Sequence, residues 1–105
     1  MMTKFSNGYL KKDRVWFVHE CKTPGWEAML CTDGGGDTYV RISEDDLPAL
    51  TSGLTELMTT DDRKVWVNVA RVMSIVNLAV FYQLTLANGH DFDVVDVSAL
   101  LEAIK

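Results

Sequence analysis

Residues 19–33 bring together side-chain types that bind metals or undergo redox chemistry. This stretch, HECKTPGWEAMLCTD, contains a histidine, two cysteines and an aspartate. Imidazole, thiolate and carboxylate groups are the usual ligands of zinc. Structural zinc sites, however, draw their cysteines from closely spaced pairs, and Cys21 and Cys31 are ten positions apart. We therefore expect no metal and no cofactor, and keep a metal site formed by His19, Cys21 and Cys31 as an alternative.

The register of the hairpin that contains this stretch decides whether that alternative is possible. In a strand, His19 and Cys21 lie on the same face because side chains alternate. A two-residue turn at Pro24-Gly25 would place Cys31 opposite Val18, on the other face from Cys21. Other loop lengths would place Cys31 opposite His19 or Cys21, and they stay open because Pro-Gly favours a type II turn. We predict that both cysteines are small, buried, apolar residues with free thiols.

The sequence contains no other pattern that indicates catalysis. A Cys-His nucleophile pair needs hydrogen-bond reach and a third orienting group, and His19 lies two residues from Cys21 in the same strand. The glycines at 34–36 lack the Lys-Ser/Thr of a phosphate-binding loop and precede Asp37 and a strand, so they predict a hairpin tip. We expect a protein that is not an enzyme and has no catalytic residues.

Composition and charge indicate one small acidic domain that spans residues 1–105. Its 105 residues are 48% hydrophobic and 24% charged, which is enough to form a core without disulfide or metal staples. The net charge of −5 and the pI near 4.8 disfavour direct binding to nucleic acid or to a membrane surface. The uncharged residues 72–89 are interrupted by polar side chains and predict two buried strands rather than a membrane span. Two cysteines and a polar start favour the cytoplasm.

The hydrophobic pattern predicts an α+β domain with a mainly antiparallel sheet, about six or seven short strands and two short helices. Residues 64–78 are rich in β-branched side chains, which favour strands over a helix. The first helix is expected to begin at Ser43 and to continue through a stripe of leucines from Leu47 to Leu57. Pro48 and Gly53 weaken this segment, and a break into short turns is the alternative. Asp96 or Ser98 is expected to begin the second helix.

An internal echo suggests two halves, 14–58 and 63–105, each with three strands followed by a helix. Residues 14–18 resemble residues 64–68, and aligning Gly36 with Gly89 also aligns Tyr39 with Phe92. Residues 59–62 would then connect the halves. Chance similarity between two α+β halves is the alternative interpretation.

The turn residues of the second hairpin set its expected register. A three-residue loop at 87–89, with Gly89 in the left-handed conformation, places Leu84 opposite Phe92 and leaves Asp91 and Asp93 facing solvent. A two-residue turn would instead bury those acids against leucines. We predict the three-residue loop.

The last forty or so residues resemble the pattern of small bacterial flagellar and swarming-associated FlbD-type proteins. The likeness consists of Val67-Asn68, a strand from Tyr82 to Leu86, Gly89 and a terminal helix. These are generic strand and turn residues, and the first half of the chain has no counterpart. The resemblance therefore implies no function.

The aromatic and acidic residues favour a non-enzymatic protein-interaction or regulatory module with a protein partner. Trp26 sits at a turn where burial within a monomer is difficult, so it is a candidate partner-binding residue, unless it simply covers the hairpin. The apolar residues 72–86 predict a homodimer. The alternative is a phage-type acidic inhibitor that mimics or blocks a nucleic-acid-binding surface, which requires its carboxylates on one face. The acids that could supply them are Glu44, Asp45, Asp46, Asp61, Asp62, Asp91, Asp93 and Asp96. Five of these, Glu44, Asp45, Asp46, Asp91 and Asp93, are also the candidate partner-binding residues.

Overall fold

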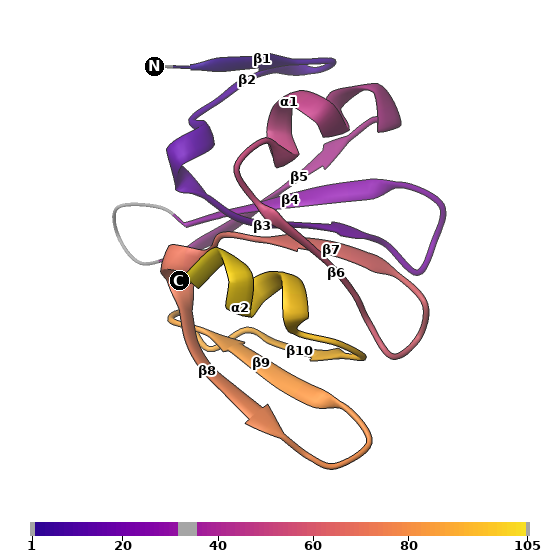
Figure 1. Ribbon diagram of the computed structural model, residues 1–105. Helices are drawn as coiled ribbons and strands as arrows, with labels where there is room; N and C mark the ends of the chain where they lie inside the picture. Colours follow the sequence, from indigo (N-terminus) through magenta and orange to yellow (C-terminus); the bar gives the residue numbers. More distant parts are fainter. Residues whose placement is uncertain (1, 32–35, 105) are drawn as a thin grey trace.

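A five-stranded antiparallel sheet forms the middle layer of the computed structural model, which describes residues 2–31 and 36–104. Figure 1 shows smaller elements covering both faces of this sheet. Its strand order is β5-β4-β3-β7-β6. The five strands are β3 (Val15–Glu20), β4 (Trp26–Cys31), β5 (Asp37–Ile42), β6 (Thr55–Met58) and β7 (Lys64–Val67).

The upper face of the sheet is covered by a hairpin and a short helix. The hairpin consists of β1 (Thr3–Phe5) and β2 (Gly8–Leu10), and the helix is α1 (Leu47–Thr51). Phe5 and Leu50 pack with Val18 and Trp66 of the sheet in one buried cluster. Two 3₁₀ turns, Lys12–Arg14 and Glu44–Asp46, connect these elements to the sheet.

The lower face is covered by a second sheet and the C-terminal helix (Figure 1). The second sheet has the order β10-β9-β8, and the 3₁₀ turn Val69–Arg71 leads into it. Its elements are β8 (Val72–Asn77), β9 (Tyr82–Leu86) and β10 (Asp91–Val94), and the helix is α2 (Ser98–Ile104). Phe17, Leu84 and Leu100 are at most 2% exposed in this second cluster, and burying each contributes about 1.5–3 kcal/mol.

The predicted small domain with mostly antiparallel sheets and two short helices is confirmed, but the structure is richer in sheet than expected and the predicted strand count was too low. Ten strands lie in the described residues, because three-residue strands such as β1 and β2 carry too little alternation to be recognised. The two strands predicted in residues 72–89 are confirmed as β8 and β9. The expectation that both are buried was wrong, because β8 has no buried residue and lies at the edge of its sheet. None of the described helices is long and apolar enough to cross a membrane.

The predicted start of the first helical region is confirmed, and the structure has the alternative in which the segment breaks into short turns before Leu57. Ser43 and Asp46 form a reciprocal capping box, but α1 ends at Thr51. Gly53 then adopts a φ of 84°, which turns the chain out of the helix. Leu57 consequently lies in β6 and faces the lower core, whereas Leu50 belongs to the upper core.

The pseudo-repeat is not confirmed by the sheet topology. Residues 59–62, expected as a connector, form the turn of the β6–β7 hairpin, and the Thr59 N–H donates to the Arg63 carbonyl. β7 belongs to the proposed second half but pairs with β3 of the first. One sheet is therefore shared across the proposed boundary.

The register of the β9–β10 hairpin is confirmed. Leu84 lies opposite Phe92, and Gly89 has a φ of 92°. Phe92, opposite the buried Leu84, faces the core, and side chains alternate along a strand. Asp91 and Asp93 on either side of Phe92 therefore face solvent, and both are exposed.

The register of the β3–β4 hairpin differs from each one specified from the sequence. His19 lies opposite Glu27 and Glu20 opposite Trp26, so the loop covers residues 21–25. The Cys21 N–H donates to the Gly25 carbonyl, which closes this longer loop, and Gly25 has a φ of 136°. Gly34 and Gly35 of the predicted β4–β5 hairpin tip, like Asp33, lie outside the described residues.

Candidate functional site

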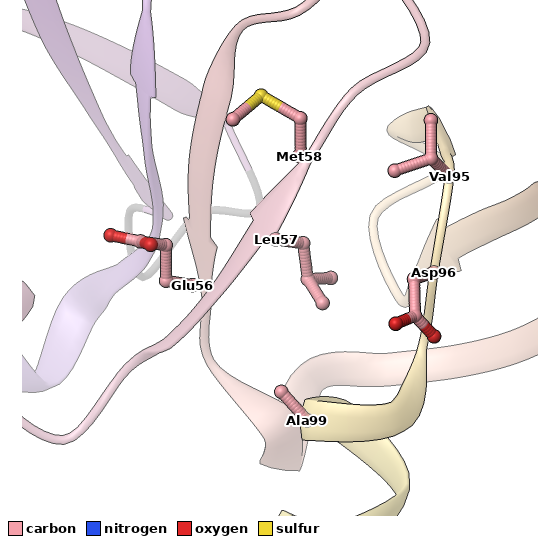
Figure 2. Close-up of a pocket in the computed structure, with 6 residues that line it drawn as sticks. All are labelled: Glu56, Leu57, Met58, Val95, Asp96 and Ala99. Atoms are coloured by element: carbon pink, nitrogen blue, oxygen red, sulfur yellow. The ribbon is translucent and has the colours of Figure 1, made fainter.

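An open groove lies between the edge strand β6 and the segment that leads into α2. It has a volume of about 310 Å³ and is lined by Glu56, Leu57, Met58, Val95, Asp96 and Ala99, and we call it the β6 groove. Figure 2 shows Leu57, Val95 and Ala99 pointing toward one another across the gap, while the Glu56 side chain points away. Glu56 therefore contributes its backbone to the groove rather than its carboxylate.

The outer edge of β6 is only partly paired. The Val95 N–H donates to the Met58 carbonyl, and the Thr60 N–H donates to the Asp93 carbonyl. Backbone groups alternate in direction along an antiparallel strand, so the N–H and C=O of Glu56 point outward like those of Met58 and Thr60. Within the described residues, no hydrogen bond joins this outward edge of Glu56 to another strand. The groove thus combines an apolar lining with an available strand edge.

Asp96 places a negative charge at the border of the groove. One carboxylate oxygen accepts from the Ser98 N–H at 2.9 Å and from the Ser98 hydroxyl at 2.7 Å, which caps α2. These hydrogen bonds outweigh the effect of burial and lower the pKa of Asp96, so its carboxyl is ionised at neutral pH. The predicted helix start at Asp96 or Ser98 is confirmed.

A second group of functional side chains lies on the lower face of the β3–β4 hairpin, beside its turn. One ligand atom each from His19, Cys21 and Glu27 lies within 4.8 Å of the others, and all three residues are half-buried. His19 Nε2 is 3.0 Å from Glu27 Oε1. Burial, followed by the nearby Glu27 carboxylate, raises the pKa of the Cys21 thiol, which is therefore protonated at neutral pH.

Cys31 does not belong to this group. It lies at the far end of β4 and pairs with Asp37, which places it about 13 Å along the strand from Glu27. Neither cysteine forms a disulfide within the described residues, and both are half-buried, so the prediction of buried cysteines was wrong. The sequence interpretation also missed Glu27, because its position opposite His19 depends on the hairpin register.

A polar network joins β5 to the β9–β10 turn. The Tyr39 hydroxyl is 2.6 Å from His90 Nε2, and the same nitrogen is 3.2 Å from an Asp37 carboxylate oxygen. The Asn88 side chain donates to the other Asp37 oxygen at 3.3 Å. Burial and the Asp37 charge raise the pKa of Tyr39. This network fixes the second sheet against the first at the surface. Because the pKa of Tyr39 is raised, its hydroxyl is protonated at neutral pH.

Trp26 is packed within the chain rather than standing free on the surface. It is partly buried against the upper cluster, and its ring centroid lies 5.6 Å from that of Trp66. Of the two interpretations of Trp26, a partner-binding residue or a residue that covers its own hairpin, this packing corresponds to the second.

The predicted partner-binding acids are divided between two layers. Glu44 and Asp45 are exposed in the 3₁₀ turn before α1, on the upper side of the five-stranded sheet. Asp46 is only 7% exposed and accepts hydrogen bonds from Ser6 and Ser43, so its carboxylate is already occupied. Asp91 and Asp93 are on β10 in the lower layer, where they line a pocket of about 290 Å³ together with Asp61 and Arg63. The structure therefore does not bring the five acids together.

Comparison of the chain with protein-family models, curated proteins and solved structures finds no match. The functional argument therefore depends on the geometry of these surfaces.

Proposed function

We propose that this protein is a small protein-interaction module that binds an extended segment of a partner protein in the β6 groove. The observation that carries the proposal is the outward N–H and C=O of Glu56 beside an apolar groove. Partner segments commonly add a strand to a sheet edge, where backbone hydrogen bonds provide affinity and side-chain pockets provide specificity.

The lining of the groove defines the chemistry of the partner. Leu57, Val95 and Ala99 offer apolar contact to one side chain of an extended segment. The Asp96 carboxylate caps α2 and carries a negative charge at the border of the groove, where it can pair with a cation. We therefore infer a partner segment that carries an apolar residue near a lysine or arginine. The net charge of −5 favours the approach of such a basic segment.

The distribution of acids favours this module over the acidic inhibitor. A phosphate mimic needs its carboxylates on one continuous face, and Glu44 lies in the upper layer while Asp91 and Asp93 lie in the lower one. Asp46 is withdrawn from any partner by its hydrogen bonds within the chain. The inhibitor remains an alternative with weaker geometric support.

The proposal is tested with a library of displayed random peptides selected on the full chain. We expect the selected peptides to combine an apolar residue with a basic one. Glu56→Pro removes the outward N–H without breaking the ladder to β7, because proline is tolerated where an edge N–H faces away from the sheet. A single hydrogen bond contributes about 0.5–1.5 kcal/mol, so binding should weaken by up to about tenfold. Glu56→Ala keeps the N–H and should bind like the natural chain.

Charge provides the second arm of this experiment. Asp96→Asn retains a residue that caps helices but removes the charge, so it should weaken the selected peptides and flatten the salt dependence of binding. Asp45→Asn changes the net charge equally in the other layer and should have no effect. If the selected peptides bind the natural chain and Glu56→Pro equally well, the proposal that they bind in the β6 groove is refuted. If Glu56→Pro does not fold, unchanged hydrogen exchange of the Glu56 amide on peptide binding would refute it instead.

A second interaction surface is favoured by the exposed apolar residues of β8 and of the turn that follows it. Met73 is 64% exposed and Val80 86% exposed, and Val76 and Leu78 are also exposed. β8 is an edge strand of its sheet, so a second copy could pair with it about a two-fold axis. We propose this edge as the surface of the expected homodimer.

A further inference from the structure

We propose that His19, Cys21 and Glu27 form a binding site for a divalent transition-metal ion of the zinc class. Their ligand atoms lie within 4.8 Å of one another, and the imidazole and carboxylate are 3.0 Å apart. Nitrogen, sulfur and oxygen donors together suit zinc and its neighbours rather than magnesium or calcium, which prefer oxygen ligands. The site is independent of the β6 groove and of its proposed partner.

The fold positions these ligands from a regular hairpin. His19 and Glu27 are direct cross-strand partners on β3 and β4, so their side chains lie on the same face. Cys21 follows β3 immediately, and its N–H donates to the Gly25 carbonyl, which holds the thiol beside the pair. Ligands on paired strands are held more firmly than ligands on a long loop.

The distances require only a small adjustment. Zinc bonds of about 2.0–2.3 Å in a tetrahedral arrangement place ligand atoms about 3.3–3.7 Å apart. The widest separation in the site, 4.8 Å, exceeds this range by about 1 Å, which side-chain rotation can supply. Three protein ligands leave the fourth position for water or for a group from another molecule.

The charges also balance. A thiolate and a carboxylate supply two negative charges, which a divalent ion neutralises, while His19 binds as a neutral imidazole. The thiol proton of Cys21 would leave when the ion binds. The nearby Arg41 guanidinium therefore faces a neutral cluster rather than an additional positive charge.

Arg41 supports the site from outside the ligand set. Its Nη1 donates to Cys21 Sγ at 3.4 Å, and its Nη2 donates to the Pro24 carbonyl at 3.1 Å. Gly25 makes room for this arrangement, because a Cβ atom at that position would overlap the Arg41 guanidinium. Hydrogen bonds to ligand atoms from outside the first shell orient them and tune metal affinity. Arg41 is accordingly a positioning residue.

Cobalt provides the test, because a cobalt–thiolate bond produces an intense charge-transfer absorption in the near ultraviolet. The chelator-treated full chain is titrated with Co²⁺ alone. We expect stoichiometric binding with this absorption, its loss in Cys21→Ser, and its retention in the matched control Cys31→Ser. Zinc added afterwards should displace cobalt and abolish the band, in keeping with the usual order of affinities for such ligands.

The histidine and carboxylate ligands are tested in the same way. His19→Gln and Glu27→Gln should each weaken cobalt binding by about tenfold or more, since even partners outside the first shell affect metal affinity by about 10–100-fold. His90→Gln, the other histidine, should bind like the natural chain. Circular dichroism would establish that each variant is folded. If Cys21→Ser does not fold, Glu27→Gln still tests the site. Its side chain keeps an oxygen opposite His19, so we expect the hairpin to remain intact.

Three results would overturn the site. The first is an absence of the charge-transfer band at saturating cobalt. The second is a band that persists in Cys21→Ser or disappears in Cys31→Ser. The third is equal cobalt affinity in folded Glu27→Gln and in the natural chain.

Discussion

Replacing Asp46 with Asn should weaken the attachment of the N-terminal hairpin to the 3₁₀ turn that precedes α1. One Asp46 oxygen accepts from the N–H and the hydroxyl of Ser6, each at 2.9 Å. The other accepts from the Ser43 N–H at 2.9 Å and the Ser43 hydroxyl at 3.1 Å. Both oxygens are therefore in use. An asparagine would necessarily turn an NH₂ group toward one of these N–H donors.

The expected loss is about 2–3 kcal/mol of unfolding free energy. A hydrogen bond to a charged group contributes about 1.5–3 kcal/mol, and losing a helix cap costs about 0.5–2 kcal/mol. The four bonds share one carboxylate, so they do not add, and the exposed Ser6 can rebind water. The expected loss of unfolding free energy is therefore close to that of one hydrogen bond to a charged group.

The same contacts predict how stability depends on pH. Burial raises the pKa of Asp46, but the hydrogen bonds from Ser43 and Ser6 outweigh it and hold the pKa below its ordinary value. A group whose pKa is lower in the folded state stabilises the fold above its unfolded pKa of about 4. This contribution is lost as the pH falls through the lower folded pKa. Asp46→Asn should therefore lose stability less steeply in acid than the natural chain.

Urea unfolding followed by tryptophan fluorescence measures both effects, at neutral pH and in steps down to the acid transition. Asp45→Asn is the matched control, because Asp45 is exposed in the same 3₁₀ turn and the charge change is equal. If the two variants lose equal stability at neutral pH, or if Asp46→Asn keeps the acid slope of the natural chain, the reasoning fails.

Three further changes test other parts of the fold. Val76→Lys on β8 should give a monomer in sedimentation at about tens of micromolar, whereas the natural chain should dimerise, and a monomeric natural chain would contradict the proposed dimer. Gly89→Ala should cost about 1–2 kcal/mol in thermal unfolding, because its φ of 92° is unfavourable for alanine although no atom lies within 4 Å of the added Cβ. Phe17→Ala should cost about 3–5 kcal/mol in urea, since this side chain is 2% exposed; a cost below 1 kcal/mol would contradict its central place in the lower core.

Local turn chemistry predicted one hairpin correctly and was insufficient for the other. At Asn88-Gly89, only one register keeps Asp91 and Asp93 out of the core, so burial and turn type agree. At Pro24-Gly25, several loop lengths are compatible with the residues. The bond from the Cys21 N–H to the Gly25 carbonyl, which selects the five-residue loop, is not encoded in any local pattern.

This difference explains which site residues could be predicted. His19 and Cys21 were recognisable from their chemistry, but Glu27 joins them only because of the register, and the same register excludes Cys31. The β6 groove was not predicted because Leu57 continues the leucine spacing of a helix. The left-handed conformation of Gly53 interrupts that helix, and long-range pairing with β7 makes the segment a strand.

The two proposed sites are joined by a single row of side chains across the lower face. His19 lies opposite Val65 on β7, and Val65 lies opposite Leu57 on β6, so about 10 Å separates the cluster from the groove. Coupling between sites requires an element with two discrete arrangements. Val65 is fully buried within a continuously paired sheet, which offers no second arrangement. Metal binding and peptide binding should therefore be independent: Cys21→Ser should leave peptide affinity unchanged, and Glu56→Pro should leave the cobalt spectrum unchanged.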